Sequence, residues 1–210
     1  MRLLLLLFFL SLFYSCETKD VEYAIVIHGG AGTILKKNMS DEMENAYIQK
    51  MEEAINAGYN ILEKNGSSID AVEATIKILE NSELFNAGKG SVLSNAGIVE
   101  MDASIMRGDN LNAGAISGVT TIKNPISAAR LVMEKSEHVF LSGKGAESFA
   151  KYENLEIVEN EYFITQRRLN SLRNAKKRDS LTDNKFGTVG CVALDSDGNI
   201  TSGTSTGGMT

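Results

Sequence analysis

One residue has the chemical group and the local setting of a self-activated nucleophile. Thr188 follows Gly187 and begins the apolar run 188–194, directly after a long polar segment. A threonine hydroxyl is a weak nucleophile that needs a neighbouring base. If the bond between Gly187 and Thr188 is cut, the new α-amino group, with an ordinary pKa of about 7.7–8.0, lies a few bonds from that hydroxyl. Gly187 has no side chain to obstruct attack on its carbonyl. Taken alone, the local sequence still favours a simpler interpretation, in which Thr188 is a β-branched residue that opens a strand.

The other glycine-rich and charged motifs exclude several kinds of site. Residues 28–32 follow an apolar run but lack the third glycine, at position 35, of a dinucleotide-binding loop. Residues 88–90 and 143–145 lack the glycine five positions before the Gly-Lys pair of a phosphate-binding loop. The two histidines form no spaced set of metal ligands, and no Gly-x-Ser-x-Gly elbow is present. The net charge of -6 argues against a nucleic-acid partner.

The elements that must position Thr188 follow from patterning and cap residues. Ser40 is expected to cap a helix that ends at Asn65-Gly66, and Ser67 or Ser68 to cap the next one. Asn124-Pro125 opens a further helix. Strands are predicted at 23–27 (buried), 99–105, 111–119, 139–141, 188–194 and from 200, and a helix at 145–152. The polar segment 166–184 predicts a flexible surface loop spanning about 165–185. Because strands and helices do not alternate regularly, the pattern favours α+β layers.

The N-terminus predicts export. Residues 1–15 combine Arg2 with an apolar run too short to span a bilayer comfortably, and thus predict a signal peptide. Ser15-Cys16 resembles the lipidation site of bacterial lipoproteins, so we expect Cys16 to be lipidated and residues 16–22 to form a tether in the periplasm or cell envelope. A plain signal peptide cleaved near Ser15 and an uncleaved anchor are the alternatives. Cys191 lies in an apolar run and is expected to be a small core residue.

Seven motifs in a fixed order resemble one family. They are His28-Gly29-Gly30-Ala31-Gly32, Phe85-Asn86-Ala87-Gly88, Met101-Asp102-Ala103-Ser104, Asn124-Pro125, Ala128-Ala129-Arg130, Gly187-Thr188-Val189-Gly190 and Thr204-Ser205-Thr206-Gly207-Gly208-Met209. Together they are similar to the plant-type asparaginase/isoaspartyl peptidase family, over residues 22–210. The resemblance implies a four-layer αββα sandwich of the N-terminal-nucleophile hydrolase type. It also implies a precursor that cuts itself before a threonine and hydrolyses asparagine or β-aspartyl dipeptides.

The resemblance also assigns roles to residues. The cut between Gly187 and Thr188 would separate an α-subunit region, 23–187, from a β-subunit that begins at 188–210. Thr188 matches the nucleophile, Thr206 a threonine that helps to activate it, and Asn86 an asparagine near the active site. A structural sodium ion would be held by the backbone carbonyls of Leu79, Glu80, Ser82, Phe85, Ala87 and Lys89, with no cofactor for the chemistry. The resemblance further implies a homodimer of αβ units. His28 is expected to have a structural role only, in shaping the loop after its strand.

The family pattern continues beyond Thr210. There the family carries an arginine and an aspartate that grip the substrate, and a threonine–glycine pair that forms the oxyanion hole. Since losing one oxyanion donor costs roughly 10²–10³ in rate, we expect the 210-residue chain to mature poorly and to have little activity. Two other hypotheses about the function stay open: a glycosylasparaginase-like amidase and an inactive, lipid-anchored fragment. The glycosylasparaginases usually carry Asn where this chain has Gly208, and they lack the motif at 28–32, which favours the asparaginase branch.

Overall fold

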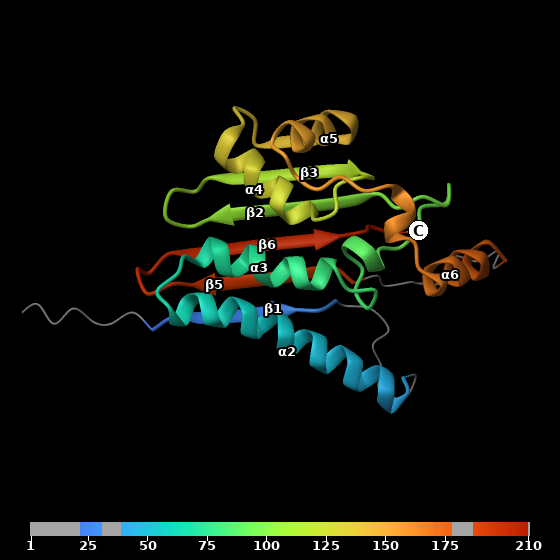
Figure 1. Cartoon of the computed structure of the whole chain (residues 1–210), viewed down its shortest axis with the longest axis horizontal. Helices are drawn as coiled ribbons and strands as arrows, with labels where there is room; N and C mark the ends of the chain where they lie inside the picture. Colours follow the sequence, from blue (N-terminus) through green and yellow to red (C-terminus); the bar gives the residue numbers. More distant parts are fainter. Residues whose placement is uncertain (1–21, 31–38, 178–186, 210) are drawn as a thin grey trace, which may run out of the picture.

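The computed structural model describes residues 22–30, 39–177 and 187–209 (Figure 1). The expected signal peptide, Cys16 and the tether up to residue 21 lie outside these ranges, as do Ala31 and Gly32. Within the described ranges, no helix is both long and apolar enough to cross a membrane.

A single mixed sheet of six strands organises the described residues. Its spatial order is β1-β5-β6-β2-β3-β4, with every neighbouring pair antiparallel except β3 and β4. The strands are β1 (Ala24–His28), β2 (Met101–Arg107), β3 (Ala113–Val119), β4 (Phe140–Ser142), β5 (Val189–Leu194) and β6 (Ile200–Thr206). The last two strands in the sequence therefore lie between the first two. Residues 189–206 thus join β1 to the rest of the sheet.

The helices begin where the sequence supplies caps. They are α2 (Asp41–Glu63), α3 (Ser68–Glu80), α4 (Pro125–Lys135), α5 (Gly143–Tyr152) and α6 (Gln166–Lys177), with 3-10 turns η2 (Gly88–Gly90) and η3 (Asn160–Phe163). The hydroxyls of Ser40 and Ser67 each accept a backbone N–H at 3.3 Å, from Met43 and Asp70. Pro125 occupies the first turn of α4, where its missing N–H costs nothing. The expected cap residues are thus confirmed, and the α+β class is correct.

Helices cover one face of the sheet, where the core lies. In Figure 1, α3 lies over β5 and β6, while α4 lies over β2 and β3, as their contacts also show. The strand positions that point to these helices are buried, namely Met101, Ala103, Ile105, Val189, Cys191, Ala193, Thr201, Gly203 and Ser205. Gly203 allows the close approach, because a Cβ there would lie 2.8 Å from Val72 and 3.0 Å from Ile76.

The opposite face has no cover among the described residues. Val26, Val192 and Met106 point to it from three strands and are 68%, 46% and 42% exposed. The expectation of a buried first strand is therefore wrong: β1 is an edge strand whose residues alternate between exposed and half-buried. The sequence pattern of five apolar residues gives no means of distinguishing these two situations.

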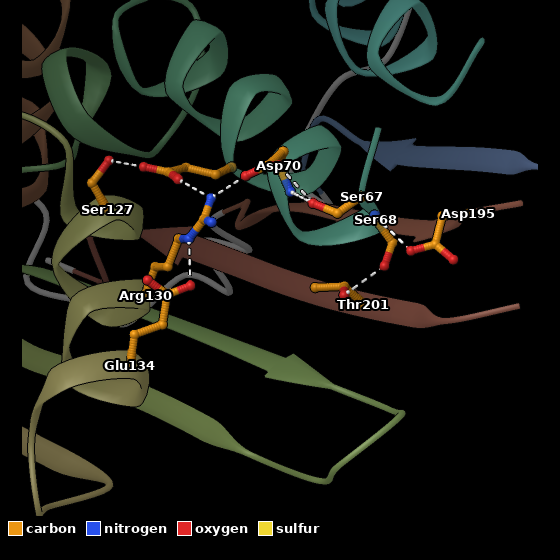
Figure 2. Close-up of polar contacts among 9 residues, drawn as sticks. Ser67, Ser68, Asp70, Ser127, Arg130, Glu134, Asp195 and Thr201 are labelled. Carbon is orange, nitrogen blue, oxygen red and sulfur yellow. Dashed lines mark hydrogen bonds and ion pairs between the residues drawn. The ribbon is translucent and has the colours of Figure 1, made fainter. Parts of the chain in front are cut away.

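A polar cluster fastens α3 to α4 and to the β5–β6 turn (Figure 2). Arg130 of α4 forms ion pairs with Asp70 and Glu73 of α3 at 2.6 and 2.7 Å. At the start of α3, Asp195 accepts the backbone N–H of Ser68 at 2.9 Å. The first turn of α3 is consequently held from both sides.

Residues 166–177 form helix α6, so the expected flexible loop is wrong over this range. The helix buries Leu172 and packs Leu169 against the core, while most of its other side chains are polar. Two leucines three positions apart were too weak a period to predict a helix. The remainder of the expected loop, 178–185, falls in the segment 178–186, outside the described residues.

Candidate active site

Thr188 lies directly before β5, with its hydroxyl on the open face of the sheet. The Thr188 hydroxyl donates a hydrogen bond to the hydroxyl of Thr206 at 3.1 Å. The two residues come together because β5 and β6 are paired with Val189 opposite Ser205. The structure thus places the two threonines that the sequence singled out within hydrogen-bond distance.

Thr206 is held as an acceptor. Its oxygen also receives the backbone N–H of Gly208 at 3.1 Å, in addition to the hydroxyl of Thr188. Two donors directed at one oxygen fix its position. The Thr206 oxygen therefore orients the O–H group of Thr188.

Asn86 is buried, and its side chain bonds groups other than the hydroxyl of Thr188. Its Nδ2 donates to the carbonyl of Gly208 at 2.9 Å, and its Oδ1 accepts the N–H of Val92 at 2.8 Å. Its backbone carbonyl also accepts the N–H of Gly207 at 3.1 Å. Asn86 consequently fixes the segment that follows Thr206. Gly207 must be glycine in this arrangement, since a Cβ would lie 2.4 Å from that of Ser91.

The loop expected to bind sodium is folded around its own carbonyl oxygens. A Cβ on Gly88 would lie 2.2 Å from the carbonyl oxygen of Glu80, and one on Gly90 would lie 2.1 Å from that of Phe85. Within the part of the chain that the structure describes, the carbonyls of Glu80, Ser82, Phe85 and Lys89 accept no hydrogen bond, whereas those of Leu79 and Ala87 each accept a backbone N–H. Free main-chain oxygens suit a hard cation, so four of the six predicted ligands are available to a sodium ion.

The side chain of Glu80 takes no part in that loop. Its carboxylate is fully buried and accepts hydrogen bonds from the backbone N–H of Ile126 at 2.9 Å and from Asn124 at 3.1 Å. Burial raises the pKa of Glu80 to about 7, against the effect of these hydrogen bonds. The carboxylate therefore joins the end of α3 to the start of α4, and only the backbone oxygen of Glu80 is available to a cation.

Two arginines that the sequence did not single out hold the same loop from α6. Arg167 donates to the carbonyls of Glu83 and Leu84 at 2.8 and 2.7 Å. Arg168 donates to the carbonyl of Gly90 at 2.6 Å. Burial lowers the pKa of Arg168 to about 10. The available signal was the Arg-Arg pair at the start of a weakly amphipathic segment.

His28 also contacts the residue proposed as nucleophile. Its Nδ1 lies 2.7 Å from the carbonyl oxygen of Thr188. The sequence predicted a structural role for His28, in the loop after its strand, and did not connect it with Thr188.

Cys191 is the cysteine that lies within the described ranges. It is buried and is the third residue of β5. Burial raises the pKa of its thiol to about 12, so a thiolate is disfavoured there. The prediction of a small, buried core cysteine is confirmed.

The fold and these motifs together define a known family. The family model described as asparaginase matches residues 21–210, and the chain belongs to this family. Isoaspartyl peptidase/L-asparaginase of Xenopus laevis is 44% identical to it over 189 residues, covering 89% of this chain and 60% of the relative. Isoaspartyl peptidase of Escherichia coli is 43% identical over 196 residues, covering 89% of this chain and 61% of the relative. The chain thus spans about three fifths of the length of these curated relatives.

Proposed function

We propose that the protein containing this chain is a self-processing amidohydrolase that uses Thr188 to hydrolyse β-aspartyl dipeptides, L-asparagine or both. The observation that carries the proposal is the pair of hydroxyls at the start of β5, with Thr188 donating to Thr206 at 3.1 Å directly after a glycine. The names of the relatives support the substrate class, since they are isoaspartyl peptidases and L-asparaginases.

The first proposed reaction is cleavage of the chain itself. The Thr188 oxygen attacks the carbonyl carbon of Gly187 and loses its proton, and the peptide nitrogen takes up a proton as the C–N bond breaks. The product is an ester between Gly187 and the Thr188 side chain. Water then hydrolyses the ester, leaving a carboxylate on Gly187 and a free amine on Thr188. Thr206 supports this reaction as the oriented acceptor beside the attacking oxygen.

The second proposed reaction uses the new amine as the base. It takes the proton from the Thr188 hydroxyl while the oxygen attacks the side-chain carbonyl of a β-aspartyl or asparagine substrate. The departing amine or ammonia leaves with a proton, and water hydrolyses the acyl ester. Asn86 and Gly208 support both reactions by fixing the position of Thr206.

Mass spectrometry of the complete gene product tests the proposal, with Thr188→Ala and Thr188→Ser as matched variants. We expect the wild type to separate between Gly187 and Thr188, Thr188→Ser to cleave because it keeps the hydroxyl, and Thr188→Ala to stay intact. Cleavage in Thr188→Ala, or none in the wild type, would overturn the proposal. Rates with a β-aspartyl dipeptide, L-asparagine and a glycosylated asparagine then separate this function from a glycosylasparaginase-like amidase.

We also propose that the protein is exported and anchored by a lipid on Cys16, as residues 1–16 of the sequence indicate. Growth with radiolabelled palmitate should label the wild type but not Cys16→Ala, while Cys191→Ala keeps the label. Equal labelling of the wild type and Cys16→Ala would contradict a lipid on this residue.

For the assembly we propose a homodimer of αβ units, which rests on the family. Light scattering coupled to size exclusion should give twice the mass of one αβ unit. A mass of one unit across a concentration series would contradict it.

A further inference from the structure

We infer that His28 is a positioning residue for Thr188, an inference that rests on the proposed function: its imidazole holds the carbonyl of the nucleophile residue and thereby orients the amine that serves as base. The observation is the 2.7 Å contact between Nδ1 of His28 and the carbonyl oxygen of Thr188.

The contact lies just beyond the end of a strand pair. β1 and β5 are antiparallel, and their last paired residues are His28 and Gly190. Thr188 is two positions further along, where β1 offers no pairing partner in the register. The side chain of His28 thus reaches past the end of the ladder and supplies the one hydrogen bond between them at that point.

Such a contact matters because the proposed cleavage turns Thr188 into a chain terminus. Terminal residues are poorly ordered unless they are tied down. Here the terminal residue would carry both the nucleophile and the base, so its disorder would affect both groups. In the described part of the chain, two side chains hold Thr188, namely Thr206 through the hydroxyl and His28 through the carbonyl.

These two contacts together determine where the amine points. The Thr188–Thr206 bond fixes the direction of Cβ from the Cα of Thr188, and the His28 bond fixes the carbonyl carbon. Two fixed heavy-atom substituents on the tetrahedral Cα leave two directions, and the L configuration assigns one of them to the nitrogen. Removal of the His28 bond leaves only the strand pairing that begins at Val189 to hold the carbonyl of Thr188, so the amine can shift relative to the hydroxyl that it must deprotonate.

The contact also sets the tautomer of the imidazole. A carbonyl oxygen can only accept, so Nδ1 of His28 must carry the hydrogen and Nε2 of the neutral ring is bare. This is the opposite of the tautomer that predominates in an unconstrained histidine side chain. The tautomer therefore reports the contact without reference to activity.

The first experiment compares His28→Ala and His28→Asn in the complete gene product. The Nδ2 of asparagine is attached at the same bond distance from the backbone as Nδ1 of histidine, so it can restore the donor. We expect kcat of His28→Ala to fall about 10–100-fold at a nearly unchanged KM, because small misplacements of reacting groups cost factors of this size. His28→Asn should recover most of the loss. Equal kcat in His28→Ala and wild type, or no recovery in His28→Asn, would overturn the inference.

A second experiment keeps the two proposals distinguishable. Long-range proton–nitrogen NMR spectra of the cleavage-blocked Thr188→Ala protein report the ring tautomer of His28, and His138→Asn removes the signal of the second histidine among residues 1–210. We expect the Nδ1–H form for His28; the Nε2–H form would overturn the inference. Absence of cleavage and turnover in the wild type overturns the proposed function, and with it the orienting of a catalytic amine.

Discussion

The two faces of the sheet obey different constraints along the same two strands. Towards the helices, β5 presents Val189, Cys191 and Ala193, all at most 2% exposed. Towards the open face, its neighbour β6 presents Thr204 and Thr206, which bond other hydroxyls. On the covered face, packing against the helices limits the size of the side chains, so substitutions there should affect the free energy of unfolding. The open face carries the reactive groups, so substitutions there should affect chemistry and leave stability nearly unchanged.

The largest effect on stability is expected at Gly203. In Gly203→Val the new side chain would meet Val72 and Ile76, at 2.8 and 3.0 Å from its Cβ alone. Overpacking of this kind costs about 3 kcal/mol of unfolding free energy. Ser202→Val is the matched control, because the neighbouring residue points to the open face. Urea unfolding of both variants measures the contrast, and equal losses would contradict the comparison.

A smaller loss of unfolding free energy, about 2 kcal/mol, is expected for Asp195→Asn at neutral pH. The reason is that both carboxylate oxygens of Asp195 accept backbone N–H groups, from Ser68 and Asn199. These bonds lower the pKa of Asp195 although burial acts in the opposite direction. A lowered pKa in the folded state means that the stabilisation is present above the ordinary value of about 3.9 and is lost as pH falls through the folded value.

Melting temperatures of wild type and Asp195→Asn should therefore converge as the pH falls below about 4. Asp197→Asn, in the same turn but exposed, serves as the control and should match the wild type throughout. A difference between wild type and Asp195→Asn that is constant over pH would rule out the charge as its cause.

Arg168→Met should lower the free energy of unfolding by about 1 kcal/mol. The variant keeps the apolar stem but loses the hydrogen bond to the carbonyl of Gly90. The same variant should speed amide exchange in α6, because the helix has few buried apolar contacts to hold it otherwise. Arg173→Met, exposed on the same helix, is the control. Exchange monitored by mass spectrometry would contradict the docking role if the two variants behave alike.

The smallest effect is expected for Val192→Thr on the open face. Its free energy of unfolding should lie within about 0.5 kcal/mol of that of the wild type. Its side chain is 46% exposed, so the added hydroxyl keeps contact with water. The same exchange at buried Val189 should cost about 2 kcal/mol, because the hydroxyl loses its hydration. Chemical denaturation of the pair tests the comparison at nearly constant side-chain volume.

Local signals in the sequence were sufficient for most helix starts and for the two hairpins. Ser40, Ser67 and Pro125 act within one turn of their own position, so their effect is visible without the fold. Helix α6 was missed because its docking depends on Arg167 and Arg168 meeting carbonyls more than 70 residues away in the sequence. The exposure of β1 was missed for a related reason, since an edge position depends on the order of the whole sheet.

The site was predictable to the extent that motifs mark it. Thr188 and Thr206 were both singled out, and the structure brings them together through the β5–β6 pairing. The contact of His28 with Thr188 joins residues 160 positions apart, and no spacing rule reaches that far. The role of Asn86 in holding Gly208 likewise depends on a loop conformation that the sequence does not display.

The buried thiol of Cys191 has a practical consequence. Because burial holds its pKa at about 12, Cys191 should react very slowly with maleimides at neutral pH. A cysteine introduced at an exposed position, such as Arg173 on α6, would then be the labelling site among the described residues without removal of the native one. A fluorophore there would report in real time whether α6 leaves the rest of the molecule when the chain is cut.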